Sequence, residues 1–83
     1  MEKNIAIKGD SKNGFKIIEL LKSLGGSNRW DFIGQRLDAF YYIDINNEID
    51  NVDNSKTLKE KGYKIYNSFE VYEKSLTINY QDI

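Results

Sequence analysis

Residues 5–26 read IAIKGDSKNGFKIIELLKSLGG, and this stretch decides the fold. It opens with a short apolar run, residues 5–7, which predicts a buried strand. Glycines at positions 9 and 14 bound a polar loop. From residue 15 onward apolar residues recur every three or four positions, which predicts an amphipathic helix that is capped by Asn13 or Ser11 and ended by Gly25-Gly26. The apolar stripe of this helix contains Phe15, Ile17, Ile18, Leu20, Leu21 and Leu24.

Aromatic and β-branched residues predict further strands downstream of this helix. The three segments richest in such residues are 30–34, 39–45 and 63–66. Between the last two, Asn46-Asn47 tolerates left-handed backbone conformations. We therefore expect residues 48–52 to fold back on segment 39–45 as the second arm of a hairpin.

Two further helices are predicted, at 56–61 and 69–74. Each follows a cluster of Asn, Ser or Asp residues that favours a helix start, and Gly62 ends the first of them. Apolar side chains alternate with polar ones near the end of the sequence, at Leu76, Ile78 and Tyr80. This alternation predicts that residues 75–83 form an extended tail or an extra strand.

The order of these elements predicts an α/β fold. A strand-helix-strand unit normally returns the chain parallel to its first strand. We therefore expect a small four-stranded, mainly parallel sheet flanked by about three helices. The chain has 83 residues, which predicts one domain, 1–83, with a single modest core.

The composition excludes many kinds of active site. The sequence has no Cys and no His, so structural zinc, disulfides, thiol nucleophiles and imidazole catalysis are not available to it. We expect no enzyme activity, no metal and no cofactor. No apolar run reaches the roughly 20 residues of a membrane span, and the first residues lack a signal-peptide pattern. A cytoplasmic protein is therefore expected. The high content of Asn, Ile and Lys beside only two Arg indicates an AT-rich genome, bacterial or phage.

Charge is distributed unevenly along the chain although the net charge is only −1. A near-neutral total argues against a protein that coats DNA without sequence preference, since such binding needs several contacts from Lys or Arg to phosphates. Residues 37–55 hold five acidic residues and no basic ones. Asp44, Glu48 and Asp50 in this stretch form a candidate surface for a basic protein partner. The alternative is a solvated hairpin with no binding role.

Several features in sequence order resemble a BRCT domain. They are a strand ending at Gly9, a helix closing on Leu24-Gly25-Gly26, an aromatic middle strand, and Ser55-Lys56-x-x-Lys59-x-x-Gly62 before Tyr63-Lys64-Ile65-Tyr66. The likeness covers residues 4–74, and it is greatest to the phosphate-binding type found in bacterial NAD-dependent DNA ligases and clamp-loader large subunits. The resemblance implies a four-stranded parallel sheet and a phosphate site between the loop after strand 1 and the start of helix 2.

Carried over residue by residue, the resemblance implies that Gly9 is the loop glycine and that Lys56 is the lysine opening helix 2. Lys8 stands where the family has a hydroxyl residue, which leaves Ser11 as the nearby hydroxyl. A basic residue in the first turn of helix 1 corresponds to Lys16 when counted from Gly9.

An argument from physical chemistry also favours an anion site here. A glycine-bounded loop that leads into a helix exposes unpaired N–H groups at the positive end of the helix dipole. Lys12, Lys16 and Lys56 are expected to converge on that point. The alternative is that Gly9 and Gly14 are turn glycines and that the lysines are solvated. The loop lacks the Lys-Ser/Thr pair of a nucleoside-triphosphate P-loop.

Aromatic residues offer a further candidate contact. Tyr41, Tyr42 and Trp30 could stack on a nucleobase, although aromatic residues at strand spacing more often belong to the core. The leading hypothesis is a non-catalytic module that captures a phosphoryl group on a nucleic-acid end such as DNA, on a nucleotide or on a phosphoprotein. The alternative is a small protein-interaction or inhibitor domain, including one that sequesters nucleotides. A homo-oligomer is compatible with both.

Overall fold

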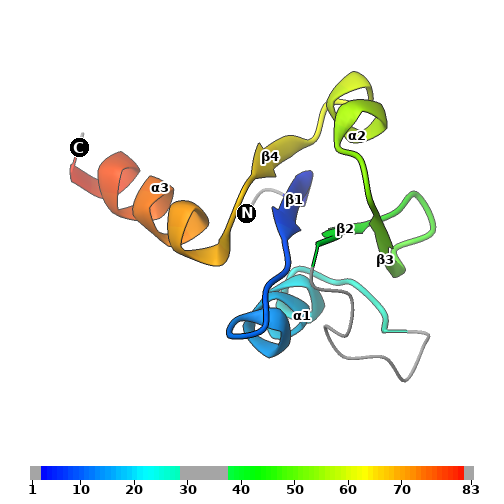
Figure 1. The fold of residues 1–83 in the computed structure, drawn as a ribbon, viewed down its shortest axis with the longest axis horizontal. Coiled ribbons are helices and arrows are strands. Elements are labelled where there is room, and N and C mark those ends of the chain that lie inside the picture. Colours follow the sequence, from blue (N-terminus) through cyan, green and yellow to red (C-terminus); the bar gives the residue numbers. More distant parts are fainter. Residues whose placement is uncertain (1–2, 29–37, 82–83) are drawn as a thin grey trace.

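The computed structural model describes residues 3–28 and 38–81, and it contains four strands and three helices in these ranges (Figure 1). In chain order they are β1 (Ile5–Lys8), α1 (Gly14–Ser23), β2 (Phe40–Ile43), β3 (Ile49–Val52), α2 (Lys56–Glu60), β4 (Lys64–Tyr66) and α3 (Phe69–Gln81). The predictions for the first strand, the first helix, the hairpin and the α2–β4 unit are confirmed. The strand predicted at 30–34 lies outside the described residues.

The four strands form one mixed sheet in the order β3-β2-β1-β4. Only β1 and β4 pair in parallel, whereas β1–β2 and β2–β3 are antiparallel. The prediction of a mainly parallel sheet is therefore wrong. The chain that follows α1 returns to the edge of the sheet where β1 ends, because the Gly9 N–H donates to the Ala39 carbonyl at 2.9 Å. As a result β2 starts beside the end of β1 and runs in the opposite direction.

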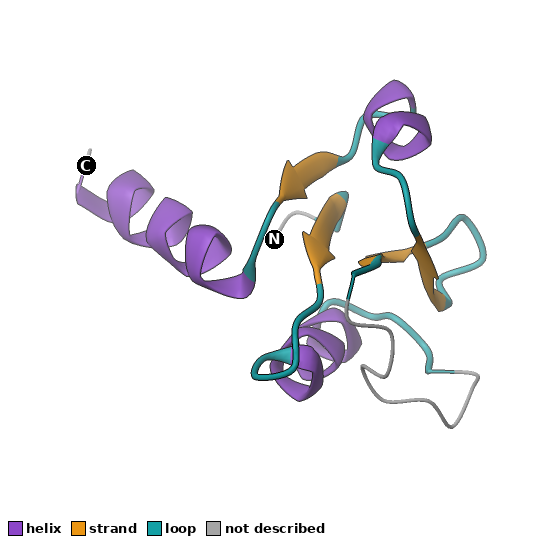
Figure 2. Cartoon of the chain, viewed as in Figure 1, coloured by secondary structure: helices purple, strands orange, loops and turns teal. Residues whose placement is uncertain are grey.

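Both faces of the sheet are covered by helices (Figure 2). On one face α1 and α3 pack on the side chains of the larger core cluster, which includes Ile7, Tyr41 and Ile49. On the other face Leu58 of α2 packs with the residues of a smaller cluster, which are Ala6, Phe40 and Tyr42. Neighbouring strand residues alternate between the two clusters, as the pleat of a sheet requires.

Helix α1 buries a narrower stripe than its sequence predicts. Ile17, Ile18 and Leu21 are fully buried as expected. Phe15 is 65% exposed, because it lies one position off the line of buried residues at 14, 17, 18 and 21. Asn13 occupies the N-cap position but its side chain does not cap the helix.

Helix α1 ends at a close approach of the backbone to the sheet. The Gly26 N–H donates to the Leu21 carbonyl at 2.9 Å. A Cβ atom at Gly26 would lie 2.8 Å from Cγ1 of Ile49 and 3.0 Å from Cγ1 of Ile43. The predicted helix end at Gly25-Gly26 is confirmed, and Gly26 is required because the sheet leaves no room for a side chain.

Helix α3 extends further than predicted. The Ser68 Oγ accepts the Val71 N–H at 3.1 Å, which confirms the predicted helix start. The prediction of an extended tail after residue 74 is wrong, because the helix continues to Gln81. No Gly or Pro stands in this segment to end the helix. A strand there would need a partner, but Figure 1 shows α3 projecting away from the sheet.

Candidate functional site

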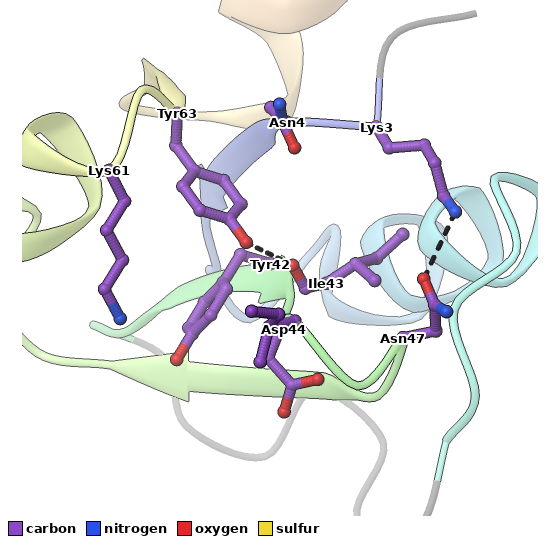
Figure 3. A pocket seen from close by; sticks show the side chains of 9 residues that line it. Lys3, Asn4, Tyr42, Ile43, Asp44, Asn47, Lys61 and Tyr63 are labelled. Carbon is purple, nitrogen blue, oxygen red and sulfur yellow. Dashed lines mark hydrogen bonds between the residues drawn. The ribbon is translucent and has the colours of Figure 1, made fainter.

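A cleft of about 570 Å³ opens at the edge of the sheet where β1 and β4 begin and β2 ends (Figure 3). We call it the edge cleft. Its walls come from the residues before β1, the turn between β2 and β3, and the connection from α2 to β4. It is lined by Lys3, Asn4, Tyr42, Ile43, Asp44, Ile45, Asn47, Lys61 and Tyr63. Its volume falls within the range of about 300–1,000 Å³ typical of small-molecule sites.

The turn between β2 and β3 forms one wall and is held by its own hydrogen bonds. One carboxylate oxygen of Asp44, Oδ1, accepts the N–H groups of Asn46 at 2.8 Å and of Glu48 at 2.9 Å. Asn47 has a φ of 62°, the left-handed conformation expected of an asparagine at this position. This ordered turn leaves the side chain of Ile45 94% exposed at the rim of the cleft.

Two tyrosines form the aromatic wall. The rings of Tyr42 and Tyr63 meet edge to face, with their centroids 5.5 Å apart. The Tyr63 hydroxyl donates a hydrogen bond to the carbonyl of Ile43. Burial raises the pKa of both hydroxyls above the usual tyrosine value; the charges of Asp50 and Asp44 add to this for Tyr42, and that of Asp44 for Tyr63. Both tyrosines are therefore neutral at physiological pH.

Two lysines stand on opposite sides of the edge cleft, with the tyrosines and Asp44 between them (Figure 3). Lys3 Nζ donates to the side-chain oxygen of Asn47 at 3.2 Å. Among the described residues the Lys61 ammonium group, Nζ, has no hydrogen-bond or ion-pair partner, and the residue is exposed. The cleft thus offers one uncommitted ammonium group, two aromatic rings and one carboxylate.

The loop predicted to bind phosphate lies at the opposite edge of the sheet. The Gly9 N–H, which was predicted to bind phosphate, donates a hydrogen bond to the carbonyl of Ala39. The carboxylate of Asp10 accepts the N–H groups of Lys12 at 2.8 Å and of Asn13 at 2.7 Å. These two hydrogen bonds, the one from Asn13 foremost, hold the pKa of Asp10 below its usual value. A carboxylate of the chain itself therefore occupies the place at the start of α1 where a phosphate was expected.

A buried amide brings a second carboxylate to this loop. The side chain of Asn13 is only 2% exposed, and its Nδ2 lies 3.3 Å from Asp10 Oδ2 and 3.2 Å from both carboxylate oxygens of Glu70. The amide thereby connects the loop to the first turn of α3. Two carboxylates in one place disfavour a further anion.

The other predicted phosphate ligands are distributed over two faces of the sheet. Ser11, Lys12 and Lys16 are exposed around the loop and α1. Lys56 opens α2, which covers the opposite face, and its N–H donates to the Asn54 side chain at 2.8 Å. In Figure 1 α2 and the loop stand on opposite sides of the sheet. The role of these residues in phosphate binding stays a prediction, but the fold separates Lys56 from the other four.

The three acidic residues predicted to meet a partner all lie on the β2–β3 hairpin. Asp44 and Glu48 belong to the turn, and Asp50 lies in β3. The carboxylate of Asp50 accepts the N–H of Asn51 at 2.7 Å. Asp50 pairs with Tyr42 across the two strands and therefore lies on the same face of the hairpin as Tyr42, and Asp44 lines the edge cleft.

Most of the edge cleft, including Lys3, Lys61 and Tyr63, was not predicted from the sequence. The sequence indicated Tyr42 only as a residue that could stack on a base or belong to the core. In the structure Tyr42 is 9% exposed, Tyr41 is fully buried, and Trp30 lies outside the described residues. The sequence did contain a signal for this cleft. Lining residues at 3–4 and 61–63 come just before two strands that pair in parallel, and the residues before parallel strands lie at the same edge of a sheet.

No family model, no curated protein and no solved structure matches this chain. The resemblance to BRCT domains therefore stays a prediction. Within residues 3–28 and 38–81 no helix has the length and apolar character needed to cross a membrane. The same residues contain no group of three or more Asp or Glu side chains placed to hold a metal ion.

Proposed function

We propose that this protein is a non-catalytic binding module that captures a small phosphorylated ligand in the edge cleft. The observation that carries the proposal is the placement of Lys61, an exposed cation without a partner among the described residues, beside the Tyr42–Tyr63 wall of a cleft of ligand size. Lysine binds phosphate as a point charge. The phosphoryl-binding function expected from the sequence is retained, and its location changes.

The cleft supports this function better than the loop at Gly9 does. In the loop, the backbone N–H groups of Lys12 and Asn13 are already bound to Asp10. In the cleft, the single carboxylate, Asp44, has one oxygen engaged by two N–H groups of the turn, which offsets part of its charge. An added phosphate therefore meets less repulsion at the cleft than between Asp10 and Glu70.

A binding role without catalysis follows from the groups that line the cleft. The sequence supplies no His or Cys. The two tyrosines have raised pKa values and stay protonated at neutral pH, so neither is a ready base. Asp44 is the single carboxylate among the lining residues. Among the described residues that line the cleft there is no pair of acid and base groups of the kind that most hydrolytic mechanisms need.

The test is calorimetric titration of the protein with small phosphorylated compounds. A charge-assisted hydrogen bond from Lys61 contributes on the order of 1.5–3 kcal/mol, so Lys61→Ala should weaken binding by about ten- to a hundredfold. Lys59→Ala is the matched control, because Lys59 is exposed on the neighbouring α2 and does not line the cleft. Lys56→Ala should also have little effect. If Lys56→Ala weakened binding and Lys61→Ala did not, the phosphate would bind at the start of α2 and not in the edge cleft.

A second candidate function is protein interaction through the β2–β3 hairpin. The observation that favours it is the 94% exposure of Ile45 between the acidic residues of the turn. A basic peptide should then bind, with loss on the combined change Glu48→Gln and Asp50→Asn and no effect of Lys61→Ala. Binding of phosphorylated compounds with no binding of basic peptides would remove this candidate.

A further inference from the structure

We infer that the ligand of the edge cleft is a nucleoside phosphate, with its base on the tyrosine wall, its sugar hydroxyls on Asp44 and its phosphate on Lys61. This inference rests on the proposed function and names the ligand class for the same site. The cleft presents an aromatic wall, a carboxylate and an ammonium group, and the base, sugar and phosphate of a nucleotide match these three groups.

The tyrosine wall suits a flat aromatic ring. Tyr42 and Tyr63 already meet edge to face, so the pair presents a preorganised aromatic corner. Ile45 also lines the cleft, and its side chain is 94% exposed. A base placed against the tyrosines can bury apolar surface of Ile45 as well. Inorganic phosphate or pyrophosphate would use none of this surface.

Asp44 distinguishes a nucleotide from a simpler anion. Its Oδ1 holds the turn through two backbone N–H groups, and within the described residues Oδ2 has no hydrogen-bond partner. A carboxylate repels a bare phosphate but accepts hydrogen bonds from hydroxyl groups. Sugar hydroxyls are donors of this kind, and they lie between the base and the phosphate in a nucleotide.

Lys61 is the better of the two lysines for the phosphate. Lys3 is already hydrogen-bonded to Asn47, on the far side of the cleft from the tyrosines (Figure 3). Lys61 stands on the tyrosine side and has no described partner. The acidic stretch of residues 37–55, which includes Asp44, disfavours a long nucleic-acid strand with a phosphate at every step.

The experiment compares four probes by calorimetry on the intact chain: a ribonucleoside 5′-monophosphate, the same nucleoside, the 2′,3′-dideoxy monophosphate and inorganic phosphate. The monophosphate should bind at least tenfold tighter than the nucleoside, the dideoxy analogue and phosphate. In the Lys61→Ala variant the monophosphate should bind no more tightly than the nucleoside. Asp44→Asn keeps an oxygen that can accept the N–H groups of the turn. In this variant the monophosphate should bind no more tightly than its dideoxy analogue.

Asp38→Asn is the control for the lost negative charge, because Asp38 is exposed and outside the cleft. Equal affinity for inorganic phosphate and the monophosphate would overturn the inference and leave phosphate capture standing. No binding of any phosphorylated probe would overturn the proposed function itself. Tighter binding of a single-stranded oligonucleotide than of the monophosphate would overturn the inference in favour of a nucleic-acid ligand.

Discussion

The two edges of the sheet differ in how their charged groups are used. At the edge where β1 ends, Asp10 and Glu70 converge on the amide of Asn13, and Asp10 accepts the N–H groups of the two residues that precede α1. At the edge where β1 begins, Lys61 stands beside two tyrosine rings without a partner among the described residues. The polar groups at the first edge bind one another. At the second edge the Lys61 ammonium group is left for the ligand that we propose.

This difference shows why a glycine-bounded loop before a helix does not by itself make an anion site. The N–H groups at a helix start attract the nearest anion, and that anion can be a carboxylate of the same chain. Asp10 lies within three residues of both N–H groups that it accepts, so it always competes with an external phosphate. Three predictions test the contrast between the two edges.

The largest effect is expected in the core that both edges share. Leu21→Ala removes a fully buried side chain and should lower the free energy of unfolding by about 2–5 kcal/mol. A domain of this size has a total free energy of unfolding of about 5 kcal/mol, so a large fraction of molecules should unfold near physiological temperature. Thermal denaturation followed by circular dichroism measures this. Phe15→Ala is the control in the same helix, since Phe15 is 65% exposed and should change the melting temperature little.

A smaller effect is expected at the edge where β1 ends. Asn13→Ala removes the hydrogen bonds from the buried Asn13 amide to Asp10 and Glu70 and should lower the free energy of unfolding by about 0.5–1.5 kcal/mol, because water can reach both carboxylates instead. Ligand binding in the edge cleft should be unchanged under conditions where the variant is folded. Asn46→Ala, an exposed asparagine at the other edge, is the control for stability. A Tm within one degree of wild type for Asn13→Ala would show that this edge is not held by the amide.

The smallest effect concerns the pH dependence of the same edge. The pKa of Asp10 is lowered in the folded protein, chiefly by the hydrogen bond from the Asn13 N–H. Its contribution to stability is therefore present above the ordinary aspartate pKa and is lost as the pH falls through the lowered value. Asp10→Asn should be less stable than wild type at neutral pH, and the difference should shrink in acid. Urea denaturation across this pH range measures the difference, and Asp38→Asn is the control for the removal of one carboxylate because Asp38 is exposed and lies outside this loop.

The local elements could be predicted because neighbouring residues specify them. Spacing of three and four located α1, and β-branched and aromatic residues located β1, β2 and β4. Asn46-Asn47 located the hairpin, where Asn47 adopts the left-handed conformation. The end of α3 was misplaced because alternation at Leu76, Ile78 and Tyr80 favours a strand only if a neighbouring strand is available, which a local pattern cannot show.

The sequence by itself determined the order of strands and helices, the glycines that end α1 and α2, and the residue types available for binding. These depend on backbone preferences and on the period of apolar residues, which are local properties. The tertiary structure alone decided the direction of β2, the hydrogen bonds that join Asp10, Asn13 and Glu70, and the placement of Lys61 and Tyr42 in the lining of one cleft. Each of these depends on contacts between residues far apart in the chain, such as the hydrogen bond from Gly9 to Ala39, and such contacts arise only when the whole sheet has formed.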